Sequence, residues 1–102
     1  MAGTGKLHGK IAIITGAAQG MGAEHARVFV AEGARVVLTD LQEQAGQALA
    51  AELGANAQFV RHDVSKAQDW DAVLAATRAA FGPANVLINN AAMYFIGPVD
   101  EA

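Results

Sequence analysis

Short apolar runs alternate with longer stretches of helical periodicity along the chain. The runs are continuous and do not alternate with polar residues, which is the pattern of strands buried on both faces. They are Ile11–Ile14, Val36–Leu38, Phe59–Val60 and Val86–Ile88. Because helical stretches separate the runs, the pattern predicts βαβ units and a parallel sheet.

The stretches between the runs have recognisable helix ends. The first helix should run from Met21 to Glu32, and the second from Gln42 to Leu53 with Gly54 as its stop. The third should open at Ser65 with capping-box spacing and end at Gly82-Pro83. One face of each helix should pack on the sheet: Gly22, Ala26, Phe29 and Val30 in the first, Ala45, Leu49 and Leu53 in the second, and Trp70, Val73, Leu74, Thr77 and Phe81 in the third.

A strand order of 3-2-1-4 would place the first two helices on one face of the sheet and the third on the other, because crossovers are right-handed. The switch point would then lie between the first and fourth strands, where open α/β sheets bind ligands. We therefore expect a Rossmann-type doubly wound parallel sheet, with about four strands and three helices. Residues 1–102 should form a single domain with a flexible leader over residues 1–9.

Two local expectations follow from the same pattern. Gly46, inside the second helix, should be a mild defect of about 1 kcal/mol relative to alanine. The chain ends in mid-pattern after the fourth strand, so that strand should present an unpaired hydrogen-bonding edge and favour association.

Composition narrows the possible functions. Apolar residues make up 53% of the chain and charged residues 17%, so a packed core is expected and disorder is not. The net charge is −3 without a basic cluster, which argues against nucleic-acid binding. The chain has no cysteine, no secretory signal and no apolar run long enough to span a membrane, so we expect a cytoplasmic protein without a metal site.

A glycine-rich turn directly follows the first strand and opens the first helix, in the segment Thr15–Gly22. A dinucleotide's diphosphate needs bare backbone N–H groups at a helix N-terminus. Gly16 permits the turn, Gly20 lets the backbone approach the phosphates, and Gly22 allows close packing. We expect Gln19 and Met21, in the same turn, to contact the cofactor as well. The alternative is that the glycines only make a strand-to-helix turn.

Two further motifs follow later strands, namely Asp63-Val64 and Asn89–Ala92. With Thr15–Gly22, they resemble the short-chain dehydrogenases/reductases from about Gly9 to the end of the chain. Within that family the chain is loosely similar to bacterial hydroxysteroid dehydrogenases and ketoacyl reductases. The resemblance implies an NAD(H)-dependent oxidoreductase that transfers hydride between the nicotinamide and a secondary alcohol or ketone, and a homo-oligomeric parent enzyme. Ala92 departs from the glycine that is usual there.

Asp40 lies just past the second strand, where a carboxylate can accept hydrogen bonds from the adenosine ribose and repel the extra phosphate of NADP. NADP-using relatives place arginine or lysine in the glycine-rich turn or just after this position. This chain has Gln19 and Leu41 there, so NAD is the expected cofactor. Asp40 could instead, or in addition, cap the following helix.

The resemblance assigns the adenine to Asp63 and to the main-chain amide of Val64, and the cofactor ribose to Asn90. For Asp63 a solvated loop carboxylate is the alternative. His62, His8 and His25 have no second ligand at metal spacing and are expected at the surface.

The family's catalytic Ser and Tyr-x-x-x-Lys are not found. The serine of this chain is Ser65 and its tyrosine is Tyr94, with Pro98 four residues later. We therefore expect the chain to stop before the catalytic half and to be inactive alone. A free-standing, non-catalytic nucleotide-binding module is the alternative, and a flavodoxin-like domain is a weaker one.

Overall fold

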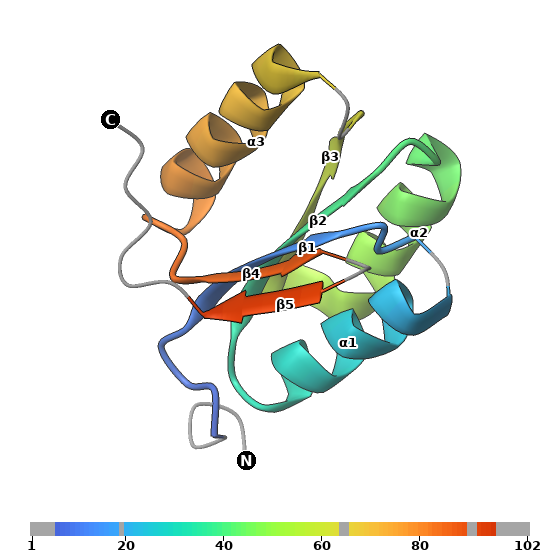
Figure 1. Cartoon of the computed structure of the whole chain (residues 1–102). Helices are drawn as coiled ribbons and strands as arrows, with labels where there is room; N and C mark the ends of the chain where they lie inside the picture. Colours follow the sequence, from blue (N-terminus) through green and yellow to red (C-terminus); the bar gives the residue numbers. More distant parts are fainter. Residues whose placement is uncertain (1–5, 19, 64–65, 90–91, 96–102) are drawn as a thin grey trace.

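The computed structural model of the chain describes residues 6–18, 20–63, 66–89 and 92–95. Its strands form one sheet in the order β3-β2-β1-β4-β5 (Figure 1). Four of them pair in parallel: β1 (Ile11–Thr15), β2 (Arg35–Asp40), β3 (Ala57–Arg61) and β4 (Val86–Asn89). The predicted order 3-2-1-4 is therefore confirmed, and the switch point lies between β1 and β4.

The fourth strand has a partner on its outer side. β5 (Ala92–Phe95) pairs antiparallel with β4, and Ile88 lies opposite Met93. The expectation of an unpaired edge on β4 is therefore wrong, because the chain returns alongside β4 and satisfies its backbone groups. The association inferred from that edge loses its basis.

Helices cover both faces of the sheet. Figure 1 shows α1 (Gly20–Ala31) and α2 (Glu43–Leu53) on one side and α3 (Ala67–Ala80) on the other. A short 3₁₀ helix, Gly54–Asn56, connects α2 to β3. This is the arrangement that right-handed crossovers require for the observed strand order.

The start of α3 differs from the expectation. The helix begins at Ala67, and its N-cap residue is Lys66, whose side chain makes no capping hydrogen bond. The predicted capping residue, Ser65, lies outside the described residues. The N-terminal amides of α3 are thus not capped by the side chain at the position that precedes the helix.

The sheet separates two apolar layers, because successive strand residues point to opposite faces. On the α3 side, Ile13 and Val37 pack with Val73 and with the half-buried Trp70. On the other side the buried residues come from the four parallel strands, from α1 and α2, and from the turns beside them: Ala12, Ile14, Ala17, Ala23, Ala26, Phe29, Ala34, Val36, Leu38, Leu49, Ala50, Phe59, Val86 and Ile88.

The packing of α2 corrects the interpretation of Gly46. Gly46 is buried, and a Cβ atom at this position would overlap the aromatic ring of Phe59 on β3. Gly46 is therefore a close-packing residue and not a defect. The buried face of α2 contains Gly46, Leu49 and Ala50, whereas Ala45 is half-buried.

Asn85 joins β1 to the residue before β4. Its Oδ1 accepts a hydrogen bond from the main-chain N–H of Ile11 at 3.0 Å. Its own N–H donates to the carbonyl oxygen of Ile11 at 2.9 Å. This two-point connection links segments that are 74 residues apart and fixes how β1 and β4 align at their amino ends.

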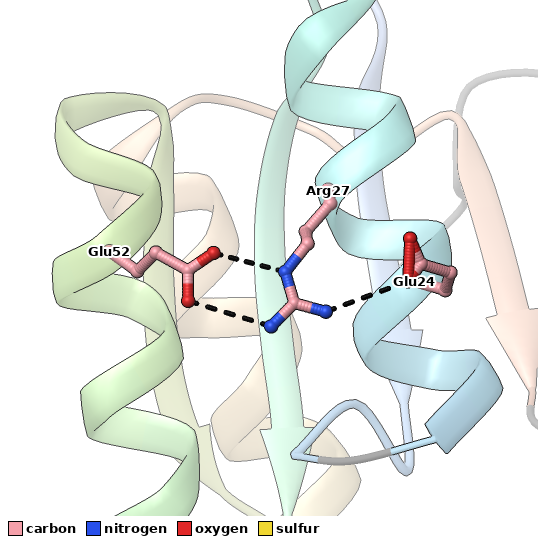
Figure 2. A network of polar contacts seen from close by, with 3 residues as sticks. All are labelled: Glu24, Arg27 and Glu52. Atoms are coloured by element: carbon pink, nitrogen blue, oxygen red, sulfur yellow. Dashed lines mark hydrogen bonds and ion pairs between the residues drawn. The ribbon is translucent and has the colours of Figure 1, made fainter.

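An ion pair links α1 to α2 on their exposed sides. Figure 2 shows Arg27 with two of its nitrogens directed at the carboxylate of Glu52, with Nε to Oε2 at 3.0 Å, and a third nitrogen 3.6 Å from Glu24. The hydrogen bond and charge of Arg27 lower the pKa of Glu52. Since all three side chains are exposed to water, this network contributes little to the stability of the fold.

Candidate nucleotide site

The glycine-rich turn leaves β1 with a backbone that side chains would strain. Gly16 has φ +62° and Gly20 has φ +64°, both in the left-handed region that favours glycine. A Cβ atom at Gly20 would have nothing within 4 Å, so the main chain there faces open space. Gln19, between them, lies outside the described residues.

Gly22 packs against the turn itself. A Cβ atom at Gly22 would overlap the carbonyl oxygen of Gly16 and lie 2.9 Å from the Cα atom of Ala17. The absence of a side chain therefore lets the first turn of α1 lie directly beneath the glycine-rich turn. Met21, on the opposite side of this helix start, is 67% exposed.

Asp40 ties the glycine-rich turn to the end of β2. Its Oδ2 accepts a hydrogen bond from the N–H of Ala18 at 3.0 Å, and its Oδ1 accepts one from the N–H of Gln42 at 2.9 Å. The N–H of Ala17 also donates to the carbonyl oxygen of Thr39 at 3.0 Å. Asp40 thus holds the residue that precedes α2 and anchors the turn. It does not cap the helix, because the N-cap residue of α2 is Gln42 and no side chain makes a capping hydrogen bond there.

Asp63 follows β3 and is held from α3. Its N–H donates to Oδ2 of Asp69, in the first turn of α3, at 2.9 Å. Its carbonyl oxygen accepts a hydrogen bond from the N–H of Lys66 at 3.0 Å. Val64, the predicted partner of the adenine, lies outside the described residues, as does Asn90 after β4.

His62 is buried, so its assignment to the surface is wrong. The side chain is only 2% exposed, and its ring stacks on Trp70 with the centroids 5.1 Å apart. Nδ1 lies 3.2 Å from Oγ1 of Thr39, which is also buried. His62 continues the alternation of β3 on the α3 side, after Val60, and that period-2 pattern was the signal that could have found it. His8 is exposed as expected, whereas His25 is half-buried.

Two cavities adjoin these residues at the carboxyl edge of the sheet. The smaller, of about 170 Å³, is lined by Gly16, Thr39, Asp40, Leu41, His62 and Asp63. The larger, of about 450 Å³, is lined by Thr15, His62, Lys66, Ala67, Trp70, Leu87 and Asn89. The fold thus brings Gly16, Asp40 and Asp63 around one cavity, while Gly20, Met21 and Gly22 line neither.

The described part of the chain contains neither a cluster of metal-ligating side chains nor a membrane-spanning helix. No group of three or more His, Cys, Asp or Glu side chains within it could hold a metal ion. No helix within it is long and apolar enough to cross a membrane. The cavity that adjoins the glycine-rich turn and is lined by Asp40 and Asp63 is the candidate ligand site.

The sheet order and the turn at its switch point define the Rossmann-type class of doubly wound α/β proteins. The model of the short chain dehydrogenase family matches residues 10–102. The chain therefore belongs to the short-chain dehydrogenase family.

Individual relatives of the chain are named as dehydrogenases. It is 47% identical over 97 residues to a 3-beta-hydroxysteroid dehydrogenase of Comamonas testosteroni, covering 95% of this chain and 38% of that protein. It is 43% identical to a trans-4-hydroxycyclohexanecarboxylate dehydrogenase of Sinomonas cyclohexanicum, covering 91% of this chain and 39% of that protein. The chain thus spans well under half the length of these relatives.

A solved structure supports the same assignment. The 3-ketoacyl-(acyl-carrier-protein) reductase of Brucella melitensis, complexed with NADH, superposes with a TM-score of 0.79 at 39% identity. The superposition covers 80% of this chain and 34% of that one. This similarity agrees with the Rossmann-type fold and the short-chain dehydrogenase family that the sequence predicts.

Proposed function

We propose that this chain forms the NAD(H)-binding part of an oxidoreductase that acts on a secondary alcohol or a ketone. When bound, the nicotinamide accepts or supplies the hydride. The residues described here hold and orient the cofactor. The observation that carries the proposal is that Gly16, in the glycine-rich turn, and the Asp40 carboxylate line the same cavity.

The turn fits a diphosphate. The main chain at Gly20 is open, and α1 begins there, so its first N–H groups and the positive end of its dipole face the same space. Because Gly22 packs beneath Gly16, no side chain lifts the helix away from the turn. We assign the diphosphate to Gly16, Gly20 and Gly22, with Gln19 and Met21 as neighbouring contacts.

Asp40 fits an adenosine ribose. A carboxylate has about four lone-pair positions, and the structure uses one on each oxygen for a main-chain N–H. The remaining positions can accept the two ribose hydroxyls. No lysine or arginine is among the residues that line this cavity, and a 2′-phosphate would meet the Asp40 charge there, so we propose NAD in preference to NADP.

The base and the second ribose complete the assignment. We propose that Asp63 and Val64 contact the adenine and that Asn90 contacts a cofactor ribose. Asp63 lines the same cavity as Asp40, which supports its part of this assignment. The relatives named as dehydrogenases and the neighbour complexed with NADH support the proposal as a whole.

Calorimetric titration of the full chain with NADH and NADPH tests the cofactor. We expect NADH to bind more tightly than NADPH. Formation of NADH from NAD⁺ is then measured with the complete protein and two alcohols suggested by the relatives, a 3β-hydroxysteroid and trans-4-hydroxycyclohexanecarboxylate. Tight NADH binding without turnover of any secondary alcohol would favour a non-catalytic nucleotide-binding module. Failure to bind either cofactor would overturn the proposal.

A further inference from the structure

His62 has surroundings unlike those of the other residues around the cavities. Its imidazole lies between the end of β2 and the first turn of α3, with Thr39 on one side and the indole of Trp70 on the other. The stacked rings are inclined by 27°. The imidazole is therefore fixed from two elements that lie on either side of it.

The two nitrogens of this ring are in different situations. Nδ1 has Thr39 as its partner, but Nε2 is buried and has no hydrogen-bond partner among the described residues. A neutral imidazole can tolerate this, since only one of its nitrogens carries a proton. Protonation would make both nitrogens donors and leave a charged N–H buried without an acceptor, which is costly.

His62 is also the one residue that lines both cavities at the carboxyl edge of the described structure. Its main-chain N–H donates to the carbonyl oxygen of Asp40 at 3.1 Å, and Asp63 follows it directly. His62 therefore adjoins both cavities, and its main-chain N–H and its ring each bind the end of β2, through Asp40 and Thr39, beside the segment that carries Asp63.

We propose that neutral His62 is a positioning residue for the adenosine end of the cofactor, and that its protonation weakens dinucleotide binding. This inference rests on the proposed function, because it concerns the same site. A charged ring is driven from between Thr39 and Trp70 toward water, and its contact with the end of β2, beside Asp40 and Asp63, is lost with it.

Charged groups from each neighbouring element act on the ring. Asp63, after β3, and Asp69, on α3, favour the protonated form, whereas burial disfavours it more strongly and lowers the pKa of His62 below its ordinary value of 6.5. Lys66 and Asp40 each line one of the cavities that His62 adjoins. The neutral ring is therefore the resting form at pH 7 and above, and the charged form appears only in acid.

The test measures binding of NAD⁺ and of ADP-ribose by calorimetry from pH 8 to pH 5, with the full chain. The diphosphates of both probes stay ionised over this range, and carboxylates titrate mostly below it. Below the pKa of His62 the affinity of the wild type should fall by about tenfold for each further pH unit, because only the neutral fraction is competent to bind. His62→Asn, which keeps a polar atom near Thr39 but does not titrate, should bind with a flat pH profile. His8→Asn, at an exposed histidine, should keep the wild-type profile.

A second measurement uses the wild-type chain alone, so it does not require that a variant folds. The pKa of His62, followed through its ring-proton NMR signals, should be lower with ADP-ribose bound than without it, since proton binding and ligand binding are reciprocally linked. An equal pKa in both states, a flat wild-type profile, or the same acid weakening in His62→Asn would overturn the inference and leave the NAD proposal standing. A wild type that binds neither probe at pH 8 would overturn both.

Discussion

The carboxylate of Asp40 accepts a hydrogen bond from the main-chain N–H of Ala18, 3.0 Å away. The two residues belong to different parts of the site, because Ala18 lies in the glycine-rich turn and Asp40 ends β2. The residue that should recognise the adenosine ribose therefore also fixes the turn that should receive the diphosphate. If Asp40 sets the cofactor preference as proposed, a change at this side chain should also change the geometry of the turn.

We accordingly expect Asp40→Ala and Asp40→Asn to weaken NADH binding. The ratio of the affinities for NADH and NADPH should also become smaller in both variants. An amide in place of the carboxylate would point its NH₂ group at one of two main-chain N–H donors, Ala18 or Gln42. Loss of a charged hydrogen bond of about 1.5–3 kcal/mol corresponds to a roughly 10- to 150-fold weaker affinity. Calorimetry with both cofactors measures the change. Asp71→Asn, an exposed carboxylate on α3, is the control, and unchanged affinity of the Asp40 variants for both cofactors would remove Asp40 from the site.

Gly22→Ala should disturb the glycine-rich turn. The new methyl group would overlap the carbonyl oxygen of Gly16, so either the turn or α1 must move. Overpacking of this kind costs about 1–3 kcal/mol of stability. We expect an additional loss of NADH affinity, since the displaced amides are those proposed to bind the diphosphate. Val28→Ala, exposed on the same helix, is the control; a Gly22→Ala protein with wild-type NADH affinity would contradict the assignment of the turn.

Gly46→Ala should destabilise the chain although alanine favours helix. The gain in helix propensity of about 1 kcal/mol is opposed by overpacking that costs about 1–3 kcal/mol, because the ring of Phe59 occupies the space. Urea unfolding measures the difference. In a double-mutant cycle, Phe59→Leu should reduce the destabilisation that Gly46→Ala causes. Gln47→Ala, at an exposed position of α2, is the control and should change stability little. A stabilised Gly46→Ala protein would show that Phe59 can move aside.

The stability of the chain should fall in mild acid because of His62. Its folded-state pKa lies below the ordinary value of 6.5, so the unfolded chain binds more protons below that pH. The stability that comes from keeping His62 neutral in the folded chain is fully present above pH 6.5. It is lost as the pH falls from 6.5 toward the pKa of His62 in the folded chain. Urea unfolding at pH 7.5 and pH 5.5 measures it, above the range in which Glu52 titrates. His62→Asn should remove this part of the pH dependence, and His8→Asn should not. If the free energy of unfolding changes equally with pH in both variants, the effect does not come from His62.

The backbone layout could be predicted from the sequence because it depends on local pattern and on handedness. The continuous apolar runs of β1 and β4 are typical of strands buried on both faces, and right-handed crossovers then leave few possible orders. The strand β5 could not be predicted in the same way. It is short, and its pairing with β4 depends on the path of the chain and not on a periodic pattern.

The burial of His62 and the fit of Gly46 depend on tertiary partners. The alternation of β3 places His62 on the same face as Val60, but the stacking of its ring on Trp70 of α3 required the folded structure. Gly46 is a defect in an isolated helix and a necessity opposite Phe59. In the candidate site, Asp40 was proposed from its position just past a strand and Asp63 from the family resemblance, whereas the hydrogen bond from Ala18 to Asp40 required the folded structure.

The double hydrogen bond between Asn85 and Ile11 lies at the end of the sheet remote from the cavities. These hydrogen bonds add to the ladder that pairs Ile14 with Ile88, and so support the register that brings Thr15 and Asn89 to the larger cavity. Asn85 thus contributes to the arrangement of a cavity that it does not line.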